Sequence, residues 1–288
     1  MRGIGTASGA ISVVNALLSG MGCAAAVDLS ARASVELEPS NSESSVRLAA
    51  ECDTPLLRAT LRSGLHRLGG AARFRGWARV ESEVPWACGL KSSSAASAAL
   101  LRALQSALDP SAVAPDEQLA TELVSIHRRV GLTATGGFDD AMVALAGGVV
   151  GADNRSNRVT HRGEMPPDWA AVLWTPPVRH PAAPSLLLRF LGLATEGRRA
   201  AALLSEGKYA EAMEINTRAV EGALGLDYTE LRQQVAGIGA VAAGISGLGP
   251  TLAVVAPLDR LSACERELGQ GGGSIRRVTF LRPRQSAP

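Results

Sequence analysis

The chain has 288 residues, of which 46% are hydrophobic and 19% are charged, a composition typical of a globular protein rather than a disordered one. Its formal net charge of +2 is spread along the chain, so the charge gives no argument for nucleic-acid binding. Much of the apolar content is alanine and only 3% of the residues are aromatic, which predicts a core built mainly from aliphatic side chains.

Strand and helix patterns follow one another through the first half of the chain. Apolar and polar residues alternate over Ala31–Leu37, which predicts a half-buried strand, and a second strand is expected over Ala71–Val80. Leucines at helical spacing predict three helices, over Pro55–Leu68, Ser92–Leu108 and Pro115–Val130. No strand or helix is predicted before Ala31, where glycines and serines interrupt the apolar residues.

The second half of the chain is predicted to form another mixed unit. The stretches "WAAVLWTP" and "TLAVVAP" are typical of buried strands, and a last strand is expected over Ser274–Leu281. Helices are expected over Ser185–Leu224, Tyr228–Val241 and Leu258–Leu268. Because these patterns alternate without a regular period, we predict the α+β class, with one lobe over residues 1–158 and a second over residues 159–288.

Several classes of protein find no support in the sequence. The four cysteines form no CxxC pair, and we expect them to be reduced thiols. The first residues contain no apolar signal segment, and no run reaches the roughly 18 apolar residues of a membrane helix. We therefore expect a cytoplasmic protein without nucleic-acid or membrane partners.

One stretch, "GLKSSSAASAALL" from Gly89 to Leu101, has the features of a phosphate site. A glycine lets backbone amides approach a ligand, and the first turn of a helix leaves amide hydrogens unpaired at the positive end of its dipole. Lys91 adds a compact positive charge in a chain whose basic residues are nearly all arginine. The alternative is a serine N-cap on a core helix, and the local residues do not decide between the two. The stretch does not match the GxxxxGK[ST] pattern of a P-loop.

The residues around this stretch resemble a known superfamily of kinases. The segment "PWACGLKSSSAA", Pro85–Ala96, resembles the PxxxGLGSSAA motif of the GHMP kinases, with Lys91 in place of a glycine. The GLKSSSA form is similar to that of the archaeal-type shikimate kinases. Three further stretches resemble segments of that family: Ala7–Leu29, Thr133–Ala141 and Gly244–Val255. The matches come in the family's order and span nearly the whole chain.

The resemblance implies a fold and a cofactor. GHMP kinases have an N-terminal lobe related to domain 2 of ribosomal protein S5 and a ferredoxin-like C-terminal lobe, with ATP on the serine loop. The residues that would bind ATP are Pro85, Trp86, Ala87, Cys88, Gly89, Leu90, Lys91, Ser92, Ser93, Ser94 and Ala95. Ser93 aligns with a serine that ligates Mg²⁺, and Ser94 is its rival.

The resemblance also implies catalytic and substrate residues. Asp139 aligns with an aspartate that serves as the base, Asp140 is the adjacent alternative, and Lys91 is the third catalytic candidate. A carboxylate can accept the proton that an alcohol loses, although paired acids in such a loop also cap helices. The residues expected to line the substrate are Ser8, Asp28, Gly136, Gly247 and Gly249. Ordinary turn roles stay open for Ser8 and Asp28.

One departure from the family pattern concerns magnesium. Mevalonate kinase supplies a second ligand, a glutamate, from the helix that precedes the aspartate loop. Here Glu122 is the only nearby carboxylate on the later part of that helix, and it lies further from Asp139 in the sequence than the pattern requires. We therefore expect fewer protein ligands for the metal. Arg128 and Arg129 end this helix and could reach phosphate, although arginines at helix ends more commonly interact with the dipole.

The expected function is that of a shikimate kinase, which uses ATP to phosphorylate the 3-hydroxyl of shikimate on the route to chorismate and the aromatic amino acids. One alternative is another GHMP small-molecule kinase, of the homoserine or mevalonate type. Another is a GHMP-fold protein that binds a ligand without catalysis. The GLKSSS loop argues against the first, and Asp139 together with an intact serine loop argues against the second. A monomer or a homodimer is expected.

Overall fold

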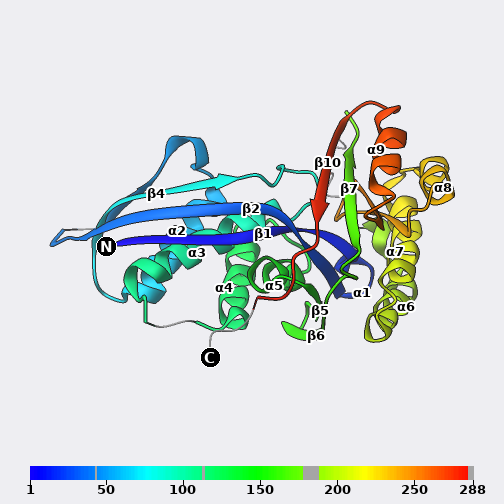
Figure 1. The fold of residues 1–288 in the computed structure, drawn as a ribbon. Coiled ribbons are helices and arrows are strands. Elements are labelled where there is room, and N and C mark those ends of the chain that lie inside the picture. The colour runs from blue at the N-terminus through cyan, green and yellow to red at the C-terminus, as the bar shows by residue number, and fades with distance from the viewer. Residues whose placement is uncertain (43, 112–113, 178–187, 285–288) are drawn as a thin grey trace.

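Two β-sheets, each covered by helices, form the protein (Figure 1). The structure, a computed structural model, describes residues 1–42, 44–111, 114–177 and 188–284. Mixed sheets and helices confirm the predicted α+β class. In the part of the chain that the structure describes, no helix is both long and apolar enough to cross a membrane.

The first sheet is built around a long hairpin. Strand β1 pairs antiparallel with β2, which pairs in turn with β4 and β5; β3 lies parallel to β4, and β6 pairs with β5. A short helix, α1 (Ala16–Ser19), forms the turn between the first two strands. The strands are β1 (Arg2–Val14), β2 (Met21–Pro39), β3 (Ser45–Leu48), β4 (Phe74–Ser82), β5 (Val149–Asp153) and β6 (Arg158–Gly163).

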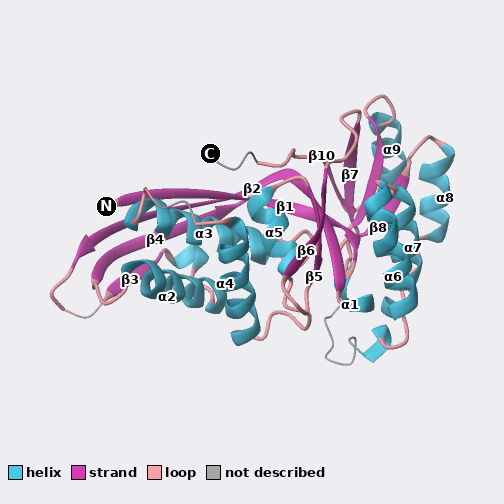
Figure 2. Cartoon of the chain, turned by 90° about the horizontal axis from the view of Figure 1, so that it is seen from below, coloured by secondary structure: helices cyan, strands magenta, loops and turns pink. Residues whose placement is uncertain are grey.

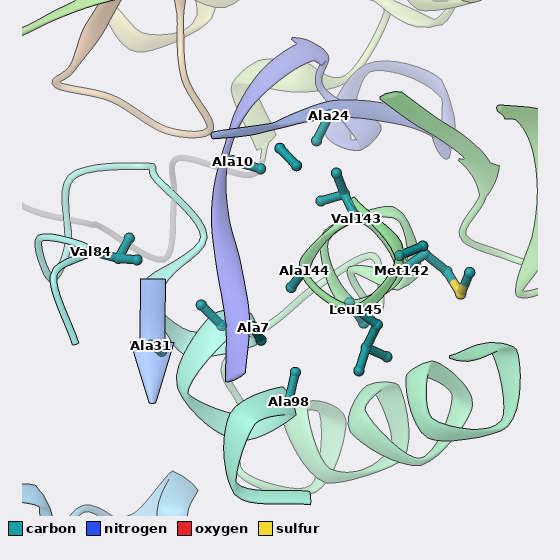
Figure 3. Packing of buried hydrophobic residues seen from close by; sticks show 14 of the residues in the cluster. Ala7, Ala10, Ala24, Ala31, Val84, Ala98, Met142, Val143, Ala144 and Leu145 are labelled. Atoms are coloured by element: carbon teal, nitrogen blue, oxygen red, sulfur yellow. The ribbon is translucent and has the colours of Figure 1, made fainter. Parts of the chain in front are cut away.

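Four helices pack on one face of this sheet (Figure 2). They are α2 (Pro55–Gly69), α3 (Ser92–Leu108), α4 (Asp116–Arg129) and α5 (Phe138–Ala146). Figure 3 shows the alanines Ala7 and Ala10 of β1 against Ala98 of α3 and the side chains of α5. Small residues are needed here because the elements lie very close. A Cβ added at Gly3 or Gly5 would overlap a backbone carbonyl oxygen of α3.

The second sheet has the strand order β10-β7-β9-β8 and is antiparallel throughout. Its strands are β7 (Trp169–Thr175), β8 (Ala242–Ile245), β9 (Leu252–Pro257) and β10 (Ser274–Thr279). Its helices are α6 (Ala194–Ala202), α7 (Tyr209–Leu224), α8 (Thr229–Gly237) and α9 (Leu261–Gly269). Helices α7, α8 and α9 contact this sheet, and α6 packs on α7. Helix α6 also contacts β1 and β2 of the first sheet, and α7 contacts β1.

The chain crosses between the two sheets more than once. After β10 it returns to the first sheet, where Leu281 N donates to Ala26 O at 3.0 Å and Gly148 N donates to Leu281 O at 3.1 Å. The division into lobes at residues 158 and 159 falls at the start of β6, which belongs to the first sheet. This division stays a prediction.

Some of the predicted helices and strands agree with the structure, and others differ from it. The helices α2, α3 and α4 and the strands β4, β7 and β9 are confirmed. Strand β1 and the first ten residues of β2 were not predicted, because the small residues that allow α3 to approach them also hide the alternating pattern. The helical segment expected over Ser185–Leu224 is divided between α6 and α7, and its residues 185–187 lie outside the described part.

Candidate active site

Two glycine-containing loops from different sheets meet at the start of α3. Ser246 Oγ donates to Gly89 O at 2.9 Å and accepts from Ser12 N at 3.1 Å, while Gly247 N donates to Ser12 Oγ at 2.9 Å. Gly89 has a φ of +80°, and a Cβ added there would overlap the backbone oxygen of Ser246. Gly89 and Gly247 therefore lie close together; the Ser246 hydroxyl bonds the Gly89 loop, and the Ser12 hydroxyl of β1 bonds Gly247.

The start of α3 is free of side-chain caps in the described part of the structure. Lys91 is the N-cap residue, with a left-handed φ of 64°, and no side chain accepts a hydrogen bond from the first-turn amides. Ser92 and Ser94 are buried and Ser93 is half-buried. The alternative of a serine N-cap is therefore wrong, and the positive end of the helix dipole lies directly behind Lys91.

A pair of aspartates begins α5, and their side chains have different partners. Lys91 Nζ lies 2.9 Å from Asp140 Oδ1, with 12% of the lysine side chain and 26% of the aspartate side chain exposed. Asp139 is only 4% exposed and interacts with Asn154, which follows β5. Asn154 Nδ2 donates to Asp139 Oδ1 at 2.7 Å, and Asp139 N donates to Asn154 Oδ1 at 3.0 Å. The loop lysine and the buried carboxyl group therefore meet at one helix start.

The surroundings of Asp139 change its acidity. Burial, and next the charge of Asp140, raise the pKa of Asp139 to about 7, against the opposing effects of Lys91 and Asn154. Burial lowers the pKa of Lys91, but the charges of Asp140 and Asp139 outweigh it and leave that pKa above its usual value. Lys91 is therefore charged at neutral pH, and Asp139 can gain or lose a proton there, as a general base must.

The expected ATP-binding residues form one continuous segment. Residues 85–88 form a partly exposed loop in which the Trp86 side chain is 50% exposed, whereas Leu90 and Ala95 are buried in the core. This segment leads directly into the uncapped start of α3.

The expected substrate residues lie in different surroundings. Ser8 is buried, and its Oγ has no hydrogen-bond partner among the described residues. Gly136 lies against Arg128, and Gly247 and Gly249 belong to the loop that meets Gly89. Asp28 is exposed and accepts hydrogen bonds from Thr279 N at 2.9 Å and Thr279 Oγ1 at 2.7 Å. The structure therefore does not join Asp28 to the aspartate pair, and its role stays a prediction.

Some residues of the site were not identified from the sequence. Asn154 lies in a polar turn that predicts only a chain reversal, and nothing nearby in the sequence connects it with Asp139. Gly22 of β2 faces the same carboxyl group, since a Cβ added there would overlap Asp139 Oδ2. Asn15 Nδ2 donates to Gly247 O at 2.7 Å and links the α1 turn to the loop that contains Gly247.

Oxygen donors suited to Mg²⁺ are present at the two helix starts. The Ser93 hydroxyl and the carboxylates of α5 are of the type that Mg²⁺ prefers, and this ion usually keeps several waters and binds substrate phosphates. In the described part of the chain no group of three His, Cys, Asp or Glu side chains could hold a metal ion by itself. Glu122 forms an ion pair with Arg67, so it is not a free ligand. The site therefore suits a metal that arrives with phosphate.

Comparison with known proteins places the chain in a family. The family model for the GHMP kinases N terminal domain matches residues 56–148. A protein of Halobacterium salinarum (strain R1) named shikimate kinase is 34% identical over 281 residues, which are 97% of each chain. The chain belongs to the archaeal-type shikimate kinases of the GHMP superfamily. A second member, named shikimate kinase of Methanosarcina mazei, is 33% identical over 91% of this chain and 87% of its own.

Solved structures of other GHMP kinases share the fold of this archaeal-type shikimate kinase. A mevalonate kinase superposes with a TM-score of 0.71 at 12% identity, covering 96% of this chain and 99% of its own. Lactococcus lactis galactokinase complexed with galactose superposes with a TM-score of 0.75 at 13% identity, covering 97% of this chain and 93% of its own. The GHMP kinase fold expected from the sequence motifs is therefore confirmed.

Proposed function

We propose that this protein transfers the γ-phosphoryl group of ATP to the 3-hydroxyl of shikimate, forming shikimate 3-phosphate and ADP. The observation that carries the proposal is the ion pair between Lys91 of the serine loop and Asp140, which places the loop beside the buried Asp139 with its raised pKa. The shikimate kinases of two archaea, which match along nearly the whole chain, support the choice of substrate. The product would continue toward chorismate and the aromatic amino acids.

The serine loop is the proposed site for the triphosphate of ATP. Residues 85–95 would surround the nucleotide, with the uncapped amides of α3 and the Lys91 ammonium facing the phosphates. Asp140 would hold the lysine in place, since the two side chains form an ion pair at 2.9 Å. Phosphoryl transfer depends on positioning and charge stabilisation, and this loop supplies both.

Asp139 is the proposed base, with Asn154 as its positioning residue. An alcohol is a poor nucleophile while it keeps its proton, and a carboxyl group with a pKa of about 7 can accept that proton at neutral pH. The two hydrogen bonds from and to Asn154 fix the orientation of Asp139. Ser8, Gly136, Gly247 and Gly249 are proposed to line the substrate.

Magnesium is the proposed metal, held by Ser93 with the help of phosphate oxygens. When bound, it would neutralise charge on the transferred phosphoryl group. Ser93 is preferred to Ser94 because it is the less buried of the two. The cytoplasmic location and the monomeric or homodimeric state stay predictions.

Turnover with a panel of alcohols tests the proposed function. Release of ADP would be measured with ATP, Mg²⁺ and either shikimate, homoserine, mevalonate or galactose, and the phosphorylated product identified by mass spectrometry. We expect turnover with shikimate. Turnover with another alcohol and none with shikimate would overturn the substrate, and no turnover with any would favour the non-catalytic alternative.

Replacing Lys91 by Ala should raise the KM for ATP or lower kcat. A hydrogen bond from a charged group contributes about 1–3 kcal/mol, which corresponds to a loss in kcat/KM of roughly ten- to a hundredfold. Steady-state kinetics with ATP as the varied substrate would measure it. The control is Lys208→Ala, since that lysine is paired with Glu206 near the surface at 2.7 Å. Equal kinetics for both variants would contradict a role for Lys91 in binding phosphate.

A further inference from the structure

A pocket of about 350 Å³ lies beside the turn between β1 and β2. Helix α1 and Gly20 line one side, and Arg128, residues 134–135 and Arg155 line the rest. None of its lining residues is acidic, and none belongs to the ATP segment 85–95. The pocket is large enough for a small metabolite and carries two positive charges.

The two arginines of this pocket have no carboxylate partner among the described residues. Within the described ranges, no ion pair within 4.0 Å involves the guanidinium group of Arg128 or of Arg155. Arg128 Nη2 makes one long hydrogen bond, 3.4 Å, to Asn154 O. Asp153 lies near Arg155, but its carboxylate accepts from Arg155 N at 2.9 Å and from Ser156 Oγ at 2.8 Å. Two unpaired guanidinium groups beside one pocket favour an anion there.

Each of the two arginines lies next to a glycine that leaves room for its guanidinium group. A Cβ added at Gly20 would lie 2.7 Å from Arg155 Nε, and one added at Gly136 would lie 2.7 Å from Arg128 Nη2. Both arginines are exposed, and part of each side chain lies against a glycine at the edge of the pocket. This contact also gives a physical reason for Gly136, which belongs to the proposed substrate residues.

Asn154 connects this pocket to the proposed base. Its backbone N donates to Gly20 O at 3.0 Å, its backbone oxygen accepts from Arg128, and its side chain holds Asp139. Lys91 contacts the start of α5 at a different residue, Asp140, with which it forms an ion pair. Asp139 therefore lies between the cationic serine loop, which suits phosphate, and the arginine pocket. An acceptor alcohol must bind on the side of Asp139 away from the phosphate, and the arginine pocket lies there.

We propose that Arg128 and Arg155 bind the carboxylate of the acceptor and make the enzyme specific for anionic alcohols. The inference rests on the proposed function and names the part of shikimate that this pocket recognises. Guanidinium groups match carboxylates in shape and charge, and the apolar side chains of α1 offer a surface to the ring. A neutral sugar alcohol of similar size would leave both arginines without a partner.

The test compares shikimate with its methyl ester, which lacks the negative charge. KM values for both compounds, and for ATP, would be measured with the wild type, Arg128→Gln, Arg155→Gln and the double variant. Each single change should raise the KM for shikimate about tenfold or more, because a charge-assisted hydrogen bond is lost. The ester should bind weakly to all four proteins, because it lacks the negative charge. The wild type should therefore prefer shikimate to the ester, and the double variant should show no such preference. The KM for ATP should be the same in all four proteins.

The matched control is Arg129→Gln, whose guanidinium group instead donates to Ser63 Oγ at 3.2 Å. Thermal melts would verify folding, and calorimetric titration of shikimate would measure its binding without turnover. This inference alone would be overturned if the wild type phosphorylates shikimate but the arginine variants keep the wild-type KM for shikimate. It would also be overturned if the variants raise the KM for shikimate and for its methyl ester by the same factor. A wild type that neither phosphorylates nor binds shikimate would overturn the proposed function and this inference with it.

Discussion

Asp139→Asn should fold, bind ATP and lose at least a hundredfold in kcat. A positioned general base contributes about 10²–10⁴ in rate, and asparagine cannot accept the proton of the hydroxyl. The substitution keeps the shape of the side chain and an oxygen that can accept from Asn154 Nδ2, so the site should stay assembled. Single-turnover phosphorylation of shikimate, with ATP binding measured separately, would check this result.

Asp140→Asn is the matched control for this prediction. It should lose less activity, because Asp140 pairs with Lys91 and does not contact Asn154 among the described residues. It should also remove the charge that helps to raise the pKa of Asp139. A severe loss in Asp140→Asn, with Asp139→Asn near wild type, would transfer the role of base to Asp140. Mild losses in both would indicate that the lysine and magnesium provide most of the catalysis.

The pH dependence gives an independent check on the same carboxyl group. A base must be deprotonated to act, so kcat/KM of the wild type should rise with pH through about 7. The folded-state pKa lies above the usual value for aspartate, so this group destabilises the folded protein as pH rises from about 4 to 7. Asp139→Asn should therefore melt higher than the wild type at pH 8, with the difference shrinking toward pH 4. A lower melting temperature at pH 8 would contradict the raised pKa.

Gly89→Ala should lower both stability and activity, with a loss in the free energy of unfolding of about 2–5 kcal/mol. An added Cβ would overlap the Ser246 carbonyl oxygen, and overpacking of this kind costs about 1–3 kcal/mol. The left-handed φ of +80° adds about 1–2 kcal/mol for a residue with a Cβ. Urea unfolding and steady-state kinetics would measure the two losses.

Gly207→Ala separates the collision from the backbone strain. Gly207 has a similar φ of +70°, but a Cβ there would meet nothing within 4 Å. Gly207→Ala should lose only the contribution of backbone strain to the free energy of unfolding, about 1–2 kcal/mol, and should keep full activity. If Gly89→Ala behaves like Gly207→Ala, the contact between the two loops has no functional importance.

Local sequence rules drew attention to the serine segment, because a glycine, a lysine and the start of an apolar helix are adjacent there, but they left a helix cap open. The resemblance to the GHMP kinases favoured a phosphate site and supplied the aspartate pair at the start of α5. The ion pair between Lys91 and Asp140 joins two such segments, and only folding brings them together.

The contacts that change the chemistry of Asp139 could not be predicted from the sequence. Asn154 directly follows β5 and Gly22 lies in β2, and their contacts with Asp139 depend on how those strands pair. The early strands themselves were missed for a related reason. Glycine and alanine have little strand preference, yet they are required where α3 lies against the backbone of β1. Close packing thus selected residues that weaken the local signal.

The return of the chain to the first sheet after β10 has a consequence for biosynthesis. Phe280 forms a bridge with Val27, and Leu281 bonds both Ala26 and Gly148, so residues that follow the second sheet add contacts to the sheet on which α5 packs. A nascent chain therefore cannot form these contacts until residue 281 has left the ribosome. A message that stops before residue 280 would yield a product that contains all the kinase motifs but lacks these contacts.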